Sequence, residues 1–387
     1  PAHMKLLGRK RLEGVPFEMY VQDGRAYVTL NSFGRWVEDG GYGQWVQTSE
    51  LMTLDVSNPT TISELGHFDV PGEISDSRLV GDALYLVTFE SGYCWNCGKT
   101  PATIVTSFGV KSGVTKVDQI EFRAPTNTYS FWRRSVSATN QRLYIGGPSW
   151  SWDGYSDANR QSVVQVVDIS DPSGHLKRGA DVAIAGQINS RWQMDEFEGH
   201  LRVVSQFGNG WFWNGSGVNP VVQTFKINSS ASITAAGQTE LTMPEPETLQ
   251  SVRFDGTRGY AITARQTDPL FTIDLSTPTA PKQVGTLEMP GSIFHMEPRG
   301  DRLVGFGNDN GTLAVSLFDV TDMAKPTMLS RVNVGSGWGS IGEDADRIHK
   351  AVRVLDQDGT ILLPFASYGG WDGSKCETPQ SGIQIID

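Results

Sequence analysis

Apolar and polar residues alternate along seven short segments of the chain, and each segment has a polar turn near its middle. Alternation with a period of two is typical of a strand with one buried face, and two such runs around a tight turn predict a β-hairpin. No long segment has helical periodicity, so the pattern predicts an all-β protein. The predicted hairpins are Phe17–Leu30, Arg78–Thr88, Val136–Ile145, Gln193–Val204, Gln250–Thr263, His295–Phe306 and Ala351–Phe365.

A short motif closes the apolar strand that follows several of these hairpins: Asp, an aliphatic residue, then Ser or Thr. The Asp side chain can accept hydrogen bonds from nearby backbone amides, and Pro cannot extend a ladder, so the strand is predicted to stop and reverse there. In three copies a Gly follows the Pro by seven residues, at Gly66, Gly179 and Gly285. The copies are Asp55–Pro59, Asp168–Pro172, Asp274–Pro278 and Asp319–Asp322.

The hairpins and the motif together define a repeat. Each hairpin is followed by a third strand and a short fourth strand, which makes a four-stranded meander of about 40 to 60 residues, the size of a propeller blade. Seven hairpins predict a single seven-bladed β-propeller domain over residues 1–387. Eight blades are the alternative.

The last blade is predicted to take its outer strand from the N-terminus. The chain ends on an apolar strand, Ile383–Asp387, with the pattern of a third strand. Gly8 and Gly14 repeat the spacing of Gly66 and Gly72, which flank an outer strand elsewhere. We therefore expect residues 4–14 to pair with residues 382–386, which would close the ring and cover a sheet edge.

Three stretches resemble a known family. Glu247–Phe254, Thr267–Leu275 and Met194–Val203 are similar to segments of the secreted bacterial and archaeal β-propeller-domain proteins, and His349-Lys350-Ala351 matches a further element. The likeness runs from about residue 14 to residue 368. The resemblance implies an extracytoplasmic protein, secreted or at the cell surface, and supplies no catalytic residues.

Five predicted loops between second and third strands are long and rich in aromatic residues and Gly, and they share one face of a propeller. Trp combines flat apolar area with a hydrogen-bonding edge, which suits a sugar ring or a protein partner. The alternative is that these rings pack on one another. The candidate ligand-binding residues are Trp36, Trp45, Trp95, Trp150, Trp152, Trp211, Trp213 and Trp371.

A second candidate site is the channel mouth, where the first strands begin. Its residues are Glu18, Arg78, Arg133, Arg191, Arg253, His295 and Lys350. This largely cationic set could hold an anion or an acidic side chain, or its members could pair with each other. The chain has no nucleophile elbow, phosphate loop or zinc-helix motif, so we expect no catalytic residue and favour a non-enzyme over an enzyme.

Charge and composition exclude some partners. The net charge of −11 disfavours nucleic acid, whose phosphates are bound by Lys and Arg. The longest apolar stretches, such as Ala314–Val320, are far shorter than the roughly 20 residues of a membrane-spanning helix. The sequence thus predicts an extracytoplasmic binding or scaffold propeller for a glycan or protein partner, with a hydrolase or lyase at the channel mouth as the alternative.

Metal chemistry has little support in the sequence. Cys94 and Cys97 form a local pair with no second pair to complete a zinc site, so a disulfide or two free thiols are expected. Asp-Gly segments such as Asp356–Gly359 could offer oxygens to calcium, but none has a complete calcium loop. We expect no cofactor, with calcium left open.

Overall fold

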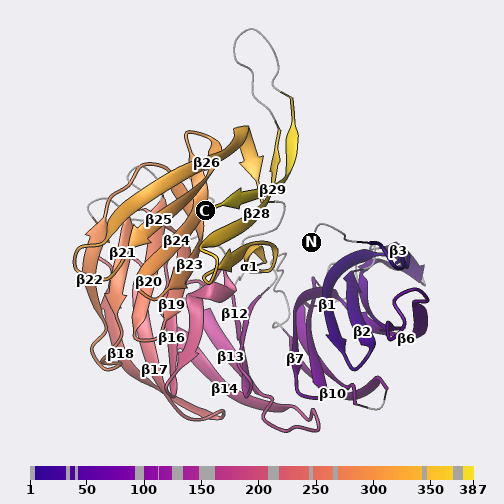
Figure 1. Cartoon of the computed structure of the whole chain (residues 1–387). Coiled ribbons are helices and arrows are strands. Elements are labelled where there is room, and N and C mark those ends of the chain that lie inside the picture. Colours follow the sequence, from indigo (N-terminus) through magenta and orange to yellow (C-terminus); the bar gives the residue numbers. More distant parts are fainter. Residues whose placement is uncertain are drawn as a thin grey trace. The chain divides into compact units, whose positions relative to one another are not determined.

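The computed structural model contains almost only strands (Figure 1). The structure describes residues 5–31, 35–39, 42–91, 100–111, 113–123, 134–147, 162–207, 218–243, 247–264, 269–341, 347–368 and 378–387. The chain divides into two compact units: residues 1–159, 163–182 and 230–232 form unit 1, and residues 160–162, 183–229 and 233–387 form unit 2. The all-β prediction is therefore confirmed.

Four-stranded antiparallel sheets built in chain order make up unit 1. A separate hairpin, β3 (Arg35–Asp39) and β4 (Tyr42–Val46), is inserted between the second and third strands of the first sheet. The first sheet is β1 (Val15–Gln22), β2 (Arg25–Asn31), β5 (Thr48–Asp55) and β6 (Ser63–Pro71); the second is β7 (Glu73–Val80), β8 (Ala83–Glu90), β9 (Ala102–Gly109) and β10 (Thr115–Arg123); the third is β11 (Ser135–Ala138), β12 (Arg142–Gly146), β13 (Ser162–Asp168) and β14 (Lys177–Ile184).

Unit 2 continues the same plan, with two single turns of helix, η2 (Arg191–Gln193) and α1 (Ile348–Ala351), before its first and last hairpins. Two sheets are β15 (Met194–Phe197), β16 (His200–Ser205), β17 (Val221–Ser229) and β18 (Ser232–Glu240), then β19 (Thr248–Asp255), β20 (Arg258–Ala264), β21 (Leu270–Asp274) and β22 (Lys282–Leu287). The next is β23 (Ser292–Arg299), β24 (Arg302–Asp309), β25 (Thr312–Asp319) and β26 (Thr327–Ser340), and β26 joins it to β27 (Arg353–Leu355), β28 (Thr360–Ser367) and β29 (Gln380–Ile386).

All seven predicted hairpins are present as paired strands: six are the first two strands of a sheet, and the seventh is β27 and β28 in the sheet that β26 joins. The turn motif also behaves as predicted. The amide of Ser57 donates to Asp55 Oδ1 at 2.9 Å, and the equivalent bond follows Asp168, Asp274 and Asp319. The hydrogen bonds from Ser57 lower the pKa of Asp55. Whether the ring has seven or eight blades stays a prediction.

Successive sheets pack face to face through the side chains of their central strands. In unit 1 the buried Tyr85 shares a core cluster with Leu143 and Val167 of the following sheet, and its hydroxyl donates to the carbonyl of Ile169 at 3.3 Å. Tyr27 makes the same bond to Val110 at 3.0 Å. Because each sheet buries its apolar face only against a neighbour, the sheets stabilise one another in sequence.

The strand predicted at residues 4–14 is not formed, since the described residues 5–14 carry no strand. A strand needs a hydrogen-bonding neighbour, and the first sheet ends at β6 without including this segment. The segment instead contacts the first sheet through side chains: Lys10 Nζ lies 3.8 Å from Glu64 Oε2, and Leu12 packs against the cluster that contains Leu30. Residues 382–386 belong to unit 2, so the predicted pairing of the two segments stays a prediction.

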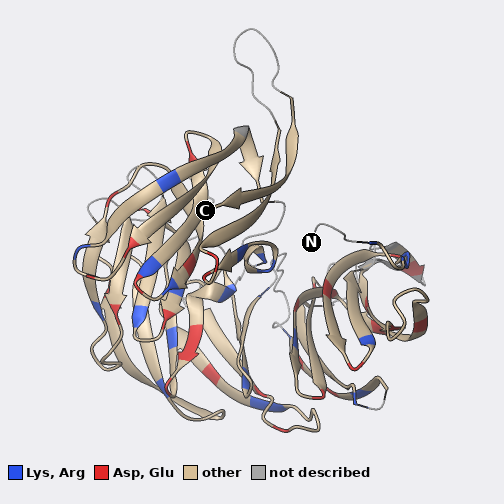
Figure 2. Ribbon diagram, in the orientation of Figure 1, with Lys and Arg blue, Asp and Glu red and all other residues tan. Residues whose placement is uncertain are grey.

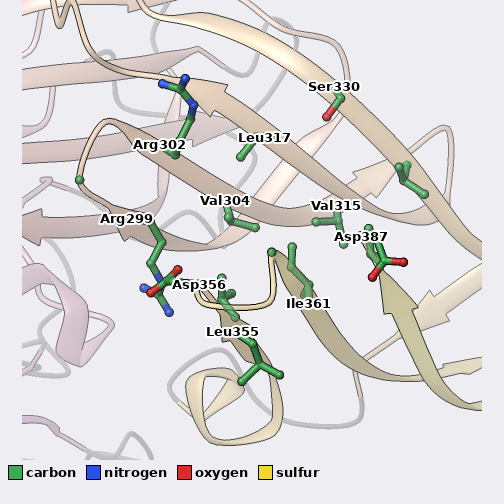
Figure 3. A pocket seen from close by; sticks show the side chains of 15 residues that line it. Arg299, Arg302, Val304, Val315, Leu317, Ser330, Leu355, Asp356, Ile361 and Asp387 are labelled. Atoms are coloured by element: carbon green, nitrogen blue, oxygen red, sulfur yellow. The ribbon is translucent and has the colours of Figure 1, made fainter.

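In unit 2, β29 has β28 as its one partner among the described strands. Ile383 and Ile385 on β29 are 68% and 59% exposed. A cavity of about 650 Å³ lies between the sheet of β24 and β25 and that of β27 and β28, and Ile386 lines it (Figure 3). The last sheet thus has a free edge beside an incompletely filled apolar layer.

Candidate functional site

First strands share a local irregularity that positions the predicted mouth residues. In β1, β7, β19 and β23 the pairing register shifts by one residue near the start of the strand. The shift makes Glu18, Asp76, Ser251 and His295 equivalent, and it makes Tyr20, Arg78, Arg253 and Glu297 equivalent two residues later. The predicted mouth residues therefore occupy two levels of the strands rather than one.

In unit 2 the mouth residues gather around the ring of Trp192, which lies on η2. The guanidinium carbon of Arg253 is 3.4 Å from the Trp192 ring centroid. The rings of His349 and His295 meet the same ring edge-on, with centroids 4.8 Å and 5.9 Å away. We call Trp192, Arg253, His295 and His349 the Trp192 cluster; its members come from four different chain segments.

Local hydrogen bonds hold η2, and therefore Trp192, in place. Ser190 caps the turn, because its hydroxyl oxygen accepts from the amide of Trp192 at 3.3 Å and its amide donates to Gln193 Oε1 at 3.0 Å. The buried Gln193 also donates Nε2 to the carbonyl of Val204 at 2.8 Å. This capping box fixes the turn against β16.

His295 is completely buried and has charged partners on both ring nitrogens. Burial lowers the pKa of His295, and the nearby Arg253 adds to that effect, which favours the neutral ring. In the neutral ring, Nδ1 accepts from Arg253 Nη2 at 2.7 Å and Nε2 donates to Glu297 Oε1 at 2.8 Å. The two partners therefore fix one tautomer.

Glu297 connects the cluster to the neighbouring sheet. Burial alone would raise its pKa, but the hydrogen bond from His295 and the nearby cations outweigh burial and lower it. Arg299 Nη1 donates to Glu297 Oε2 at 3.2 Å, and Arg299 Nε lies 3.2 Å from Asp356 Oδ1. Figure 3 shows the Arg299 and Asp356 side chains facing each other at one end of the cavity.

His349 differs from His295 in its surroundings. Burial, followed by the neighbouring Arg191, Lys350, Arg253 and His295, lowers its pKa to about 4. Its Nδ1 is buried and has no hydrogen-bond partner among the described residues. Figure 2 shows basic residues on α1, the helical turn that carries His349.

Unit 1 carries a different arrangement at the same strand positions. The Ser77 hydroxyl donates to Glu18 Oε2, and the Tyr20 hydroxyl lies 3.1 Å from Ser77 Oγ. Burial, followed by the charge of Glu18, raises the pKa of Tyr20. Arg78 is exposed, and Arg133 lies outside the described residues. Of the described basic residues of the predicted mouth, Arg78 thus belongs to unit 1, and Arg191, Arg253, His295 and Lys350 belong to unit 2.

Of the eight predicted aromatic residues, Trp36 is the one whose side chain the structure describes. It lies on β3 with 48% of its surface exposed, and its Nε1 is 3.4 Å from Glu38 Oε1. The loop predicted at residues 31–48 contains the β3–β4 hairpin, and the register opposes Trp36 and Trp45 directly. The side chain of Trp45 is not described, and six predicted residues lie outside the described part of the chain: Trp95, Trp150, Trp152, Trp211, Trp213 and Trp371.

The comparison with protein families decides the identity of the fold. A family model described as "Beta propeller domain" matches residues 1–107 and 98–386. The chain belongs to the beta propeller domain family. The successive four-stranded sheets are the blades that the sequence repeat predicted.

Relatives of this propeller are found among archaeal proteins. It is 28% identical over 238 residues to an uncharacterized protein of Archaeoglobus fulgidus, which covers 61% of this chain and 36% of the relative. It is 30% identical over 163 residues to an uncharacterized protein of Methanocaldococcus jannaschii, which covers 42% of this chain and 25% of the relative. The matched part of the propeller is thus about a third or less of the length of these relatives.

Solved structures resemble the propeller at low sequence identity. A functionally unknown protein from Desulfotomaculum acetoxidans has a TM-score of 0.44 at 10% identity, over 87% of this chain and 95% of that chain. Saccharomyces cerevisiae Sqt1 has a TM-score of 0.46 at 7% identity, over 80% of this chain and 74% of that chain. These similarities carry no argument about function.

Sequence reasoning missed Trp192, Glu297 and His349 as site residues. Trp192 directly follows the predicted Arg191, and His349 directly precedes the predicted Lys350, so proximity to a predicted residue was the available signal. Among the described residues no three His, Cys, Asp or Glu side chains are grouped so that they could hold a metal ion. Within that same part of the propeller, no helix has the length and apolar character needed to cross a bilayer.

Proposed function

We propose that this propeller is an extracytoplasmic binding or scaffold protein, and that it engages a glycan or protein partner through the aromatic loops of one face. The observation that carries the proposal is the β3–β4 hairpin, which holds Trp36 at 48% exposure and opposes it to Trp45. The pairing of β3 with β4 defines the backbone on both sides of Trp36. A large aromatic side chain kept partly exposed on such a hairpin is typical of a recognition surface.

The chemistry of Trp supports both partner classes. Its flat apolar face stacks on the apolar face of a sugar ring, and its indole N–H can donate to a hydroxyl or a carbonyl. Contacts between aromatic rings contribute about 0.5–1.5 kcal/mol beyond buried area. Two or three Trp side chains acting together would therefore supply a measurable share of an affinity.

The channel mouth of unit 2 supports binding over the alternative of a hydrolase or lyase. A general base must be able to reach the proton that it removes. The Glu297 carboxylate is already committed to His295 and Arg299, and His295 is fully buried. These groups are suited to holding the site rather than to moving protons.

The test begins with a glycan array and a pull-down that use the whole propeller as bait, followed by titration of the identified partner. Trp36→Ala, Trp45→Ala, Trp152→Ala, Trp213→Ala and Trp371→Ala should each weaken binding by about 2-fold to 12-fold, the equivalent of about 0.5–1.5 kcal/mol. Circular dichroism should show an unchanged fold in each variant.

Leu329→Ala is the control. Leu329 is 50% exposed and lies on β26, in the sheet whose connection between β24 and β25 is a short turn without an aromatic residue. It should bind the partner as the parent does, because the five long aromatic loops belong to other blades. Unchanged affinity in all five variants would assign these residues to loop packing and reject the proposal.

A further inference from the structure

The Trp192 cluster contains two imidazoles in contact with one indole ring, and their hydrogen bonding differs. His295 has a carboxylate on Nε2, at 2.8 Å from Glu297 Oε1, and Arg253 on Nδ1. The Nδ1 of His349 is buried without a hydrogen-bond partner in the described part of the chain. A buried polar atom of this kind destabilises the fold if nothing satisfies it, so its environment indicates what could do so.

The described charges that act on His349 are all basic. They come from the elements packed around it: Arg191 from η2, Arg253 from β19 and Lys350 from α1 itself. His295 on β23 belongs to the same cluster, but its lowered pKa favours the neutral ring. Grouped basic side chains create a positive potential that attracts anions, more strongly where part of the site is shielded from water. Like His295, His349 therefore lies among basic side chains, but no described carboxylate is hydrogen-bonded to its Nδ1 as Glu297 is to His295.

We propose that the carboxylate group of a small ligand binds beside His349 Nδ1, in the way that Glu297 binds His295. The ring donates from Nδ1 to one carboxylate oxygen, and the surrounding basic groups balance its charge. This site is separate from the aromatic loops, so it goes beyond the binding function proposed above and does not depend on it.

The proposal makes binding dependent on pH in a defined direction. The pKa of His349 is about 4 without ligand, and an adjacent carboxylate raises the pKa of an imidazole because it favours the charged ring. Binding then takes up one proton from solvent at mildly acidic pH. Affinity should therefore rise as the pH falls from about 7.5 to about 5, where a ligand carboxylate is still ionised.

The experiment uses the whole propeller with ¹³C-labelled histidine, and follows the ring signals by NMR as L-glutamate or D-glucuronate is added. His349→Gln assigns the His349 signal by its disappearance, and sodium chloride at equal ionic strength controls for general charge effects. The expected result is a saturable shift of the His349 signal that is at least threefold tighter at pH 5 than at pH 7.5. A preference for glutamate indicates an acidic amino acid or side chain, and one for glucuronate an acidic sugar.

Calorimetry with the same two probes supplies a second readout. His349→Gln should lose binding at least tenfold, whereas His200→Gln, a histidine on β16 outside the cluster, should bind as the parent does. Trp36→Ala should also leave this binding unchanged, which separates the site from the aromatic loops. Equal shifts with glutamate, glucuronate and chloride would overturn the proposal.

A third variant tests whether the chain supplies its own carboxylate. Residues 342–346 include Glu343, Asp344 and Asp346 in the sequence just before α1. If the probes bind only after these three are replaced by Gln, Asn and Asn, the position belongs to the chain itself and the proposal of an external ligand is wrong. Binding that is equal with and without these replacements supports the proposal.

Discussion

A Cβ atom added to Gly8 would lie 2.0 Å from the carbonyl oxygen of Pro59. In unit 2 the outer strands show the same relationship to the next blade: Gly237 lies against the carbonyl of Pro278 at 2.5 Å, and Gly285 against that of Met323 at 2.2 Å. Each carbonyl belongs to the turn that ends a third strand. Gly8 therefore contacts the first blade in the same way that Gly237 and Gly285, on outer strands, contact the next blade along the chain.

Alanine substitutions test this equivalence. Gly285→Ala forces a methyl group into a backbone carbonyl, and overpacking of this kind costs about 1–3 kcal/mol. Gly8→Ala should lower the free energy of unfolding by an amount in the same range, measured by urea denaturation. Gly109→Ala is the control, because its nearest contacts would be at 3.5 Å; if Gly8→Ala were as mild as Gly109→Ala, the equivalence would be lost.

A buried arginine is predicted to hold two blades together. Arg202 is 4% exposed, donates Nε to Asp195 at 3.0 Å and also donates to the carbonyl of Gly256 in the next blade. Its guanidinium carbon is 4.9 Å from the ring centroids of Phe197 and Phe254. Arg202→Lys keeps the charge but loses the planar fork and the stacking, so it should cost about 2–3 kcal/mol in urea denaturation.

Arg258 provides the matched comparison for Arg202. It also reaches the next blade, donating to the carbonyl of Gly300 at 3.0 Å and to Asp301 at 3.1 Å, but this pair is partly exposed. Arg258→Lys should therefore cost less than about 1 kcal/mol. Equal losses in the two variants would show that burial of Arg202 does not matter.

Stability should fall as the pH is lowered from about 6.5 to about 4. The pKa of His349 is lowered from about 6.5 in the unfolded chain to about 4 in the folded one, so the unfolded state binds more protons in that window. One proton accounts for at most about 1.4 kcal/mol per pH unit, and partial exposure reduces this to about 1–2 kcal/mol in total. His349→Gln should flatten this part of the curve, measured by urea denaturation at successive pH values.

The loss of stability assigned to His349 can be separated from the effects of other titrating groups. Glu297 has a lowered pKa, so the stability it contributes is present above about pH 4.3 and is lost below it. His349→Gln should leave the loss of stability below about pH 4.3 as in the parent, because His349 is not among the groups that lower the pKa of Glu297. If His349→Gln also followed the parent curve between about pH 4 and about pH 6.5, the surroundings assigned to His349 would be wrong.

The sequence allowed the hairpins and turns to be predicted because both depend on neighbouring residues. The bond from Ser57 to Asp55, for example, spans two positions. The Trp192 cluster depends on contacts between residues far apart in the chain: Trp192 and His349 lie on different elements, and no spacing connects them. Channel charges could be predicted from their strand positions, but the equivalence of Ser251 and His295, which places Arg253 two residues beyond the level of His295, became visible only in the structure.

The outer strands define a register for the predicted closure of the ring. Thr53 pairs with Gly66 and Thr272 with Gly285, and the residue before each Gly is bulged out of the ladder. Each Thr precedes the closing Asp of its strand by two residues. Applied to Gly8 and Asp387, the same register predicts that Gly8 would pair with Ile385 and Arg9 with Gln384 if the ring closes in this way.

Closure of the propeller is tested most directly by a disulfide between Arg9→Cys and Gln384→Cys, with Cys94, Cys97 and Cys376 replaced by Ser. Mild oxidation should give a crosslink within one chain, seen by mass spectrometry of the disulfide-linked peptides, and should raise the urea midpoint. The shifted pair Arg9→Cys with Gln380→Cys is the control and should crosslink poorly. No crosslink in the first pair, or equal yields from both pairs, would contradict closure of the ring by residues 4–14 and 382–386.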